Sequence, residues 1–359
     1  MKAVAVFPAS KQISIVDHEE PSLAGPTEAK LRMLEVGICG TDREICRFDY
    51  GIPPAGQERL IIGHESLGEV VEVGAGVSRV RKGDLVVTMV RRPCPHANCV
   101  ACCAGRQDFC YTGDFTERGI NRAHGFMTEF VVDDEQYMNV LPPALREIGV
   151  LVEPLTIAEK ALIQLGHIQQ RLPWAACKQN AVVLGAGPVG LLGAMALVTA
   201  GFDTYVYSRS SQPLAALVES FGAKYIAAET NTIEQMGAQV GAIDVIYEAT
   251  GASRLSFEAS RVLGVNGVFI FTGVPGRKGP IEVDTDLIMR DMVLKNQMVY
   301  GTVNAGRDAF EAAIRDLGIF QSRWPEAVKS LITGRYPMSQ YQELLLGAPA
   351  GIKNVIRLG

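Results

Sequence analysis

Hydrophobic and polar residues alternate in short segments over the first hundred residues, which is typical of half-buried β-strands. This pattern predicts strands at Lys2–Phe7, Ile13–Val16, Ala29–Val36, Gly68–Val73 and Asp84–Met89. Glycine and proline residues, such as Gly25-Pro26 and Pro53-Pro54, separate these segments. Short strands with this punctuation favour a β-rich, barrel-like unit.

The pattern changes near Gln179, where apolar strands begin to alternate with helices. Strands are predicted at Asn180–Leu184, Thr204–Tyr207, Tyr225–Ala227, Asp244–Glu248 and Gly267–Phe271, and helices at Val189–Ala200, Leu214–Phe221 and Leu255–Val262. Such alternation is typical of a parallel α/β sheet. A helix at Ala309–Leu317 and a strand at Asn354–Leu358 follow. We therefore expect an α/β protein in which residues 174–303 form a parallel-sheet domain inserted between residues 1–173 and 304–359.

Composition limits the classes of partner. The 34 Lys and Arg residues are interspersed with 39 Asp and Glu residues, and the net charge of −5 argues against nucleic-acid binding. The N-terminus lacks the apolar segment of a secretory signal. The most apolar later stretch, Val189 to Gly201, is shorter than the roughly 20 residues that cross a bilayer. We expect a soluble, cytoplasmic protein without a membrane partner.

A glycine motif follows the first strand of the second region. Gly185, Gly187 and Gly190 form G-x-G-x-x-G between a strand and a helix, an arrangement that binds a dinucleotide pyrophosphate. The predicted cofactor loop comprises Gly185, Ala186, Gly187, Pro188, Val189 and Gly190.

The end of the next strand indicates which dinucleotide is bound. An NAD site places a carboxylate there, whereas this chain has Ser208, Arg209 and Ser210. A guanidinium and two hydroxyls suit a 2′-phosphate, so we predict a preference for NADP, with use of NAD left open. The alternative is that Arg209 is an ordinary solvated loop residue.

Cysteines are concentrated between Cys94 and Cys110, which hold five of the eight. In a reducing compartment this density favours a closed, structural zinc site over disulfides. The proposed ligands, in a lobe near residues 91–115, are Cys94, Cys99, Cys102 and Cys110. Cys103 could replace Cys102, and His96 could replace Cys94.

A second set of metal-binding residue types is dispersed along the chain: Cys39, His64 with Glu65, and Glu153. Each has an ordinary explanation alone, for example a small core cysteine or a Glu-Pro helix boundary. A catalytic zinc uses about three mixed Cys, His and carboxylate ligands and one open position. The presence of these residues beside a four-cysteine loop and a nucleotide fold favours such a site.

These motifs occur in the order seen in the zinc-dependent medium-chain dehydrogenases, which the chain resembles from end to end. The matching elements are Gly37-Ile-Cys39-Gly-Thr41-Asp42, Gly63-His64-Glu65-x-x-Gly68, the cysteine lobe and Gly185-Ala-Gly187-Pro-Val-Gly190. The resemblance implies a GroES-like β-rich catalytic domain, a Rossmann doubly wound parallel sheet, and a homodimer or homotetramer.

Within this family the chain looks most like the glucose dehydrogenases. The resembling stretches include Arg91-Arg92, Gly105–Cys110, Glu117-x-Gly119-Ile120 and Glu153-Pro154-Leu155. The resemblance implies that Cys39, His64, Glu65 and Glu153 surround the catalytic zinc, that Thr41, Glu117, Glu153 and Asn304 contact the sugar, and that Thr272, Gly273, Val274, Thr302, Val303 and Asn304 line the nicotinamide. The chain departs from the pattern in its Cys94-x4-Cys99 spacing and in having Ile157 where some members place an aspartate.

The expected reaction is oxidation of glucose or a related aldose at C1 to a lactone, with hydride transfer to NADP. Zinc would lower the pKa of the C1 hydroxyl, Thr41 would accept its proton, and Glu44 is a candidate for an outer relay position. The alternatives are a dehydrogenase for galactose, xylose, a polyol or an alcohol, and a non-catalytic NADP-binding protein. A mere binding protein has no use for an open metal site, so the Cys39 set argues against the last.

Overall fold

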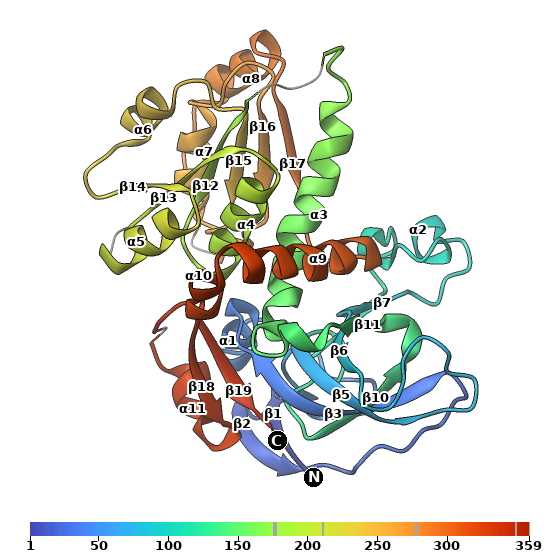
Figure 1. Ribbon diagram of the computed structural model, residues 1–359. Helices are drawn as coiled ribbons and strands as arrows, with labels where there is room; N and C mark the ends of the chain where they lie inside the picture. Colours follow the sequence, from blue (N-terminus) through green and yellow to red (C-terminus); the bar gives the residue numbers. More distant parts are fainter. Residues whose placement is uncertain (175–177, 210–211, 277–278, 349, 359) are drawn as a thin grey trace. The chain divides into compact units, whose positions relative to one another are not determined.

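A computed structural model describes residues 1–174, 178–209, 212–276, 279–348 and 350–358. The chain forms two compact units. Unit 1 consists of Met1–Glu153, Asn304–Gly318 and Val328–Gly359, and unit 2 of Pro154–Val303 and Ile319–Ala327. Figure 1 shows both units, each of which is described separately below. The domain boundaries at residues 173 and 303 stay a prediction.

Unit 1 is built on β-sheets. Its strands are β1 (Lys2–Phe7), β2 (Gln12–Asp17), β3 (Glu28–Gly37), β4 (Leu60–Ile61), β5 (Glu65–Val73), β6 (Leu85–Thr88), β7 (Arg91–Arg92), β8 (Thr116–Arg118), β9 (Arg122–Ala123), β10 (Phe130–Asp134), β11 (Met138–Leu141), β18 (Ile332–Pro337) and β19 (Lys353–Arg357). The largest sheet has the order β11-β6-β5-β3-β19-β18, with β10 also paired to β3. The five predicted N-terminal strands are all present, with ends displaced by up to a few residues.

The core of unit 1 follows from the alternating pattern. Strand β3 buries Leu31, Met33 and Val36 against Val4 and Val6 of β1. Burying each such side chain contributes about 1.5–3 kcal/mol. The C-terminal strand β19 pairs antiparallel with β3, so residues 353–357 belong to the same sheet as residues 28–37.

Unit 2 contains a six-stranded parallel sheet with the order β14-β13-β12-β15-β16-β17. Its strands are β12 (Asn180–Leu184), β13 (Asp203–Ser208), β14 (Lys224–Ala227), β15 (Val245–Glu248), β16 (Val268–Phe271) and β17 (Met298–Gly301), and helices α4 (Pro188–Thr199), α5 (Gln212–Ser220), α6 (Ile233–Val240), α7 (Ser253–Ser260) and α8 (Thr285–Leu294) surround them (Figure 1). This strand order is that of a Rossmann doubly wound sheet, which confirms the expected fold class. Because strands covered on both faces are largely apolar, β12 after Asn180 and β16 are continuous hydrophobic runs.

The remaining helices complete the described elements. They are α1 (Gly40–Cys46), α2 (Val100–Cys103), α3 (Val152–Gln169), α9 (Arg307–Arg323), α10 (Pro325–Ser330) and α11 (Tyr341–Leu346), with short 3-10 turns at η1 (Gln107–Phe109), η2 (Glu135–Tyr137), η3 (Pro143–Leu145), η4 (Gly149–Leu151) and η5 (Met338–Gln340). The sequence pattern did not predict α3, whose N-terminal half buries Glu153, Glu159 and Lys160 together with apolar residues. Within the described ranges, no helix combines the length and apolar character needed to cross a membrane.

Candidate metal centres and cofactor loop

The first candidate metal centre brings Cys39, His64 and Glu65 together in unit 1. One ligand atom of each lies within 4.8 Å of the others. Sheet pairing explains the approach, because Gly37 at the end of β3 lies opposite Glu65 at the start of β5. A Cβ atom at Gly37 would collide with the Glu65 side chain, so glycine permits the close approach.

Asp42 lies beside both Cys39 and His64, a position to which sequence reasoning assigned no role. Its Oδ2 accepts a hydrogen bond from the Cys39 backbone N–H at 2.8 Å, and its Oδ1 lies 3.3 Å from His64 Nδ1. Burial lowers the pKa of His64, but the Asp42 carboxylate and Cys39 outweigh burial and raise this pKa well above its ordinary value. With Nδ1 directed at Asp42, the other ring nitrogen is the one available to a metal. The sequence feature that could have indicated this position is an aspartate in the first turn of the helix that follows Cys39.

Glu65 has a buried partner that the sequence did not indicate. Lys353 Nζ on β19 lies 2.6 Å from both carboxylate oxygens of Glu65 and 3.1 Å from the Ile38 carbonyl oxygen. All three donors of the ammonium are therefore used. Nothing in the sequence distinguishes Lys353 from a surface lysine, since the pairing spans 288 residues.

The other predicted residues of this centre lie around it. Thr41 Oγ1 is 4.0 Å from Cys39 Sγ, and Glu44 follows on the same helix. Glu153 lies outside the 4.8 Å group, but its charge interacts with His64 and Glu65. Burial raises the pKa of the Glu153 carboxyl to about 7, while His64 opposes the shift and Glu65 adds to it.

Glu117 and Asn304, both predicted to contact substrate, lie together in unit 1. Asn304 Nδ2 donates to Glu117 Oε1 at 3.1 Å. Asn304 has a left-handed backbone with φ of 58°, a conformation that asparagine tolerates better than most residues. The sequence did not indicate two further neighbours of Glu117. One is Arg91, whose guanidinium lies 3.0 Å from it, and the other is Tyr50, whose pKa is raised by burial and then by Glu117.

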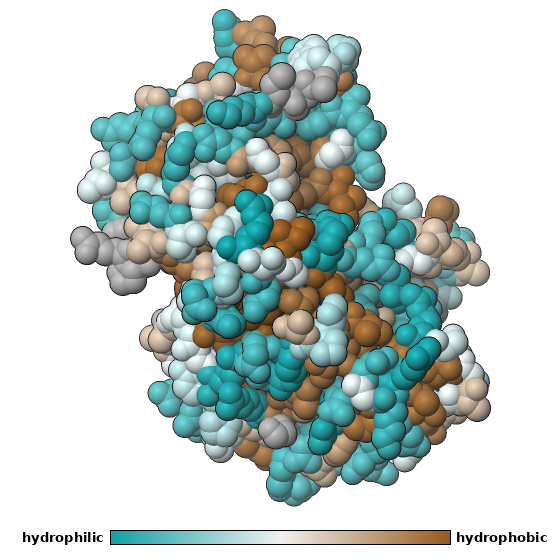
Figure 2. Space-filling model, in the orientation of Figure 1, coloured by the Kyte–Doolittle hydropathy of each residue, from teal (hydrophilic) through white to brown (hydrophobic). Residues whose placement is uncertain are grey.

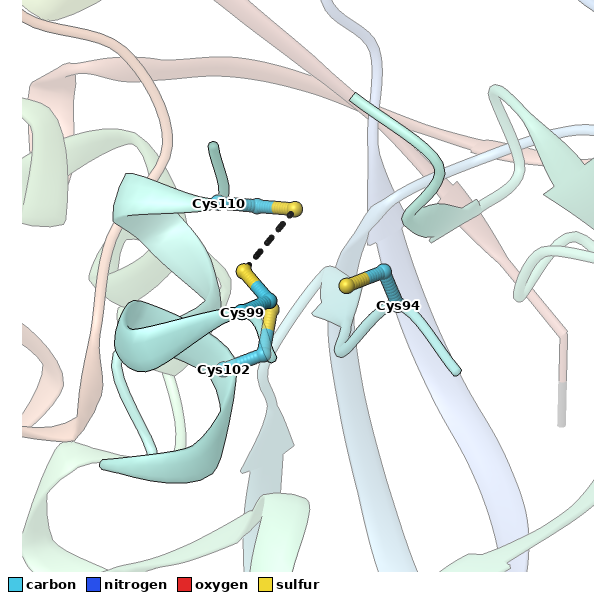
Figure 3. Close-up of side chains that lie close together, drawn as sticks. All are labelled: Cys94, Cys99, Cys102 and Cys110. Carbon is cyan, nitrogen blue, oxygen red and sulfur yellow. Dashed lines mark hydrogen bonds between the residues drawn. The ribbon is translucent and has the colours of Figure 1, made fainter. Parts of the chain in front are cut away.

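The second candidate metal centre is the cysteine loop, residues 94–110. The sulfur atoms of Cys94, Cys99, Cys102 and Cys110 lie within 4.8 Å of one another and point toward one centre, as Figure 3 shows. Cys99 Sγ and Cys110 Sγ are 3.9 Å apart. Four converging sulfurs fit a tetrahedral zinc ion.

Hydrogen bonding in this loop favours the thiolates of Cys99 and Cys110, whereas burial raises the pKa of Cys102 to about 12. Backbone N–H groups of Cys102 and Tyr111 lower the pKa of Cys99. Burial raises the pKa of Cys110, but Thr112 and the Gly113 backbone reduce it to about 6. The two alternative ligands point elsewhere: Cys103 is exposed and donates to the Ala97 carbonyl at 3.3 Å, and His96 pairs with Asp114 at 2.9 Å.

The cofactor loop in unit 2 has the geometry that a pyrophosphate needs. Gly185 has φ of 98°, and a Cβ at Gly190 would collide with the Gly185 carbonyl oxygen. A Cβ at Gly187, the N-cap of α4, would have no neighbour within 4 Å, so that backbone is open to a ligand. Ala186, Pro188 and Val189 complete the turn into α4, whose N-terminus favours an anion.

The end of β13 carries Ser208 and the exposed Arg209, with no carboxylate at either position. Ser208 Oγ lies 3.4 Å from the Arg209 carbonyl oxygen. Ser210, also predicted to bind the cofactor, lies outside the described residues.

The segments predicted to line the nicotinamide follow adjacent strands, β16 and β17. The carboxylate of the buried Glu248 accepts a hydrogen bond from the Gly273 N–H at 3.2 Å. The backbone carbonyl of Glu248 accepts a hydrogen bond from Thr272 Oγ1 at 2.7 Å. From α3, Gln164 Nε2 donates to Thr302 Oγ1 at 2.9 Å, and Lys160 Nζ donates to the Val303 carbonyl at 3.1 Å. Val274 and Val303 are exposed. Sequence reasoning assigned no role to Glu248, Lys160 or Gln164.

Comparison with known proteins gives consistent matches over the whole chain. Residues 25–143 match the alcohol dehydrogenase GroES-like domain, and residues 146–358 match the glucose dehydrogenase C-terminus. Glucose 1-dehydrogenase of Methanocella arvoryzae is 38% identical over 100% of both chains. The enzyme of Thermoproteus tenax is also 38% identical, over 100% of this chain and 99% of its own.

Comparison with solved structures supports the same family. Haloferax mediterranei glucose dehydrogenase in complex with NADP, Zn and gluconolactone is 31% identical, with a TM-score of 0.89 over 100% of this chain and 99% of that one. The family matches and these identities confirm the resemblance seen in the motifs. The chain belongs to the glucose dehydrogenase branch of the zinc-dependent medium-chain dehydrogenase family.

Proposed function

We propose that this protein oxidises glucose at C1 to the lactone and transfers the hydride to NADP. The observation that carries the proposal is the convergence of Cys39, His64 and Glu65 beside a buried aspartate. The whole-chain similarity to glucose 1-dehydrogenases, including one bound to NADP, Zn and gluconolactone, supports the same reaction.

Cys39 and His64 would hold a zinc ion, with Glu65 and Glu153 as the neighbouring carboxylates. A zinc ion held there would polarise the substrate C1 hydroxyl as a Lewis acid, and NADP would accept the hydride. Thr41, with its hydroxyl 4.0 Å from Cys39 Sγ, would accept the proton of that C1 hydroxyl and pass it outward along α1 toward Glu44.

Glu117 and Asn304 would bind the remaining sugar hydroxyls, Glu117 by accepting and Asn304 by donating or accepting hydrogen bonds. A site with paired polar groups discriminates strongly against substrates that lack the matching hydroxyl. This discrimination would favour a sugar over a simple alcohol.

The cofactor and the second metal have separate sites. The Gly185–Gly190 loop would hold the pyrophosphate of NADP, and Ser208, Arg209 and Ser210 its 2′-phosphate. Thr272, Gly273, Val274, Thr302, Val303 and Asn304 would line the nicotinamide. Cys94, Cys99, Cys102 and Cys110 would hold the structural zinc ion.

We further propose that the protein is a homo-oligomer and that a second copy pairs with strand β17. This strand ends the sheet order, with β16 as its single strand neighbour among the described residues. Met298 and Val299 on β17 are exposed, and α8 exposes Met289, Val293 and Leu294. Hydrophobic residues reach the surface around α8 in Figure 2. An edge strand can pair with its own copy about a twofold axis, and light scattering after size exclusion gives the mass that checks this.

The activity is tested by following the absorbance of the reduced nicotinamide as it forms. Glucose, galactose, xylose, a polyol and an alcohol are each assayed with NADP and with NAD, and zinc is measured per chain. We expect glucose with NADP to react fastest. Cys39→Ala and His64→Ala should abolish turnover and leave the zinc of the cysteine loop in place, with Cys103→Ser as the cysteine control. Full turnover in Cys39→Ala would contradict the catalytic metal. NADP binding without turnover on any substrate would favour a non-catalytic binding protein.

A further inference from the structure

Arg91 is a buried cation beside one of the proposed sugar-binding residues. Strands β7 and β8 pair antiparallel with Arg91 directly opposite Glu117. The Arg91 Nε and Nη2 atoms donate to Glu117 Oε1 at 3.1 and 3.0 Å, and both side chains are more than nine-tenths buried. The guanidinium also stacks on the Phe115 ring, 3.7 Å from its centroid. The Arg91 side chain therefore has one well-defined position.

These contacts hold Oε1 of the Glu117 carboxylate and leave Oε2 to accept a hydrogen bond from another partner. Three donors converge on Oε1: the Arg91 Nε and Nη2 atoms and Asn304 Nδ2. None of the three bonds uses Oε2. Charge-assisted bonds of this kind fix the rotation of the carboxylate, so Oε2 keeps a constant direction in which to accept a hydroxyl.

The remaining amino group of Arg91 reaches the cysteine loop. Its Nη1 donates to the Asp108 carbonyl at 3.3 Å, two residues before Cys110. The Asp108 carboxylate is itself held by Arg106 through bonds of 3.0 and 2.9 Å. A metal ion that binds Cys110 would order this part of the loop and with it the carbonyl that holds Arg91.

We propose that Arg91 is a positioning residue that transmits the order of the cysteine loop to Glu117 and so sets the affinity for sugar. This inference rests on the proposed function. It gives the loop's metal a second role, because the loop would stabilise the substrate site as well as itself.

The test compares Arg91→Met with Arg92→Met. Arg92 is the next residue of β7, and it pairs with the buried Asp133 rather than with Glu117. Arg91→Met leaves the buried Glu117 carboxylate without an arginine, and Arg92→Met leaves the buried Asp133 with Arg118 alone, 2.9 Å away. Both substitutions should therefore lower the melting temperature. Only Arg91→Met should raise KM for glucose, by about tenfold or more, with KM for NADP within about twofold of wild type. The dissociation constant of glucose from the NADPH-loaded enzyme, followed by NADPH fluorescence, should rise in parallel.

Two further variants complete the design. Arg91→Lys keeps a cation near Glu117 but cannot reach Oε1 and the Asp108 carbonyl together, so it should recover part of the affinity and serves if Arg91→Met does not fold. Cys102→Ser should lose one zinc ion and raise KM for glucose in the same direction as Arg91→Met.

The outcomes separate the proposals. A wild-type enzyme that does not oxidise glucose overturns the proposed function and this inference with it. An active wild type whose Arg91→Met variant binds glucose normally, or whose Arg92→Met variant loses affinity equally, overturns the role of Arg91 alone. Loss of the loop metal with unchanged KM overturns the link to the cysteine loop.

Discussion

Lys353 Nζ lies 2.6 Å from both carboxylate oxygens of Glu65, and this pair joins the C-terminal strand β19 to the first residue of β5. Both side chains are at most 2% exposed. Burial lowers the pKa of Lys353, but Glu65 and then Cys39 raise it above its ordinary value, so the ammonium stays charged. The last segment of the chain thus stabilises the first candidate metal centre.

Removing one member of the Lys353–Glu65 pair should lower the free energy of unfolding. Lys353→Met leaves the Glu65 carboxylate buried without its cation, and breaking a buried pair costs about 3–5 kcal/mol. We expect the free energy of unfolding, measured by urea denaturation, to fall by that amount. The double variant Lys353→Met with Glu65→Gln should recover part of the loss.

The matched control is Lys2→Met, which breaks the Lys2–Asp17 ion pair of 2.7 Å at an exposed position. Exposed pairs contribute little, so its denaturation midpoint should equal that of wild type. Equal midpoints for both lysine variants would show that the Glu65 pair does not stabilise the protein.

Cys102 and Cys103 are neighbours with different environments, and they should respond differently to replacement. Cys102→Ser removes one of four converging sulfurs, so bound zinc should fall by about one ion per chain and the melting temperature should decrease. Cys103→Ser changes an exposed thiol and should leave zinc content unchanged. Metal analysis with a thermal melt checks both, and the reverse result would make Cys103 the ligand.

Arg209 should determine which dinucleotide is preferred. Removing a charge-assisted bond to a phosphate costs about 1.5–3 kcal/mol, so Arg209→Ala should lower kcat/KM for NADP by about ten- to a hundredfold. Because NAD has no 2′-phosphate, kcat/KM for NAD should change by less than about twofold. Equal losses for both cofactors would indicate that Arg209 acts on the fold rather than on the phosphate.

His124 should make stability depend on pH. Burial, and then the nearby His18, lowers the pKa of His124 in the folded protein from 6.5 to about 4. Between these values the unfolded chain binds a proton that the folded protein does not, so stability is fully present above pH 6.5 and falls toward pH 4. Because the ring is partly solvated, we expect a loss of about 1 kcal/mol between pH 7 and pH 5.

His124→Asn is the variant that checks this. Its side-chain oxygen can accept the Ile61 N–H bond that His124 Nδ1 accepts at 3.1 Å, but the amide does not titrate. Urea denaturation at pH 7 and pH 5 should show a smaller decrease in the variant than in wild type. An unchanged decrease would assign the pH dependence to other groups.

Local patterns were sufficient for much of the architecture. Strands β1 to β3 and the alternating elements of unit 2 follow from periodicity and glycine punctuation, because those signals act over a few residues. The pattern was insufficient for α3, because its N-terminal half buries Glu153, Glu159 and Lys160 together with apolar residues. Polar and apolar positions there do not separate into an exposed and a buried face. The candidate ligands were also visible, because few residue types bind zinc and the family motifs order them along the chain.

The sequence by itself determined the residue types of both metal sets, the glycine loop and the missing carboxylate after β13. Only the tertiary structure decided which partners hold those residues: Asp42 beside His64, Lys353 beside Glu65, and Arg91 beside Glu117. Arginine, lysine and aspartate are common surface residues, and their roles here depend on sheet pairings between distant segments. Such pairings place two side chains within bonding distance through the packing of the whole unit, which no local pattern records.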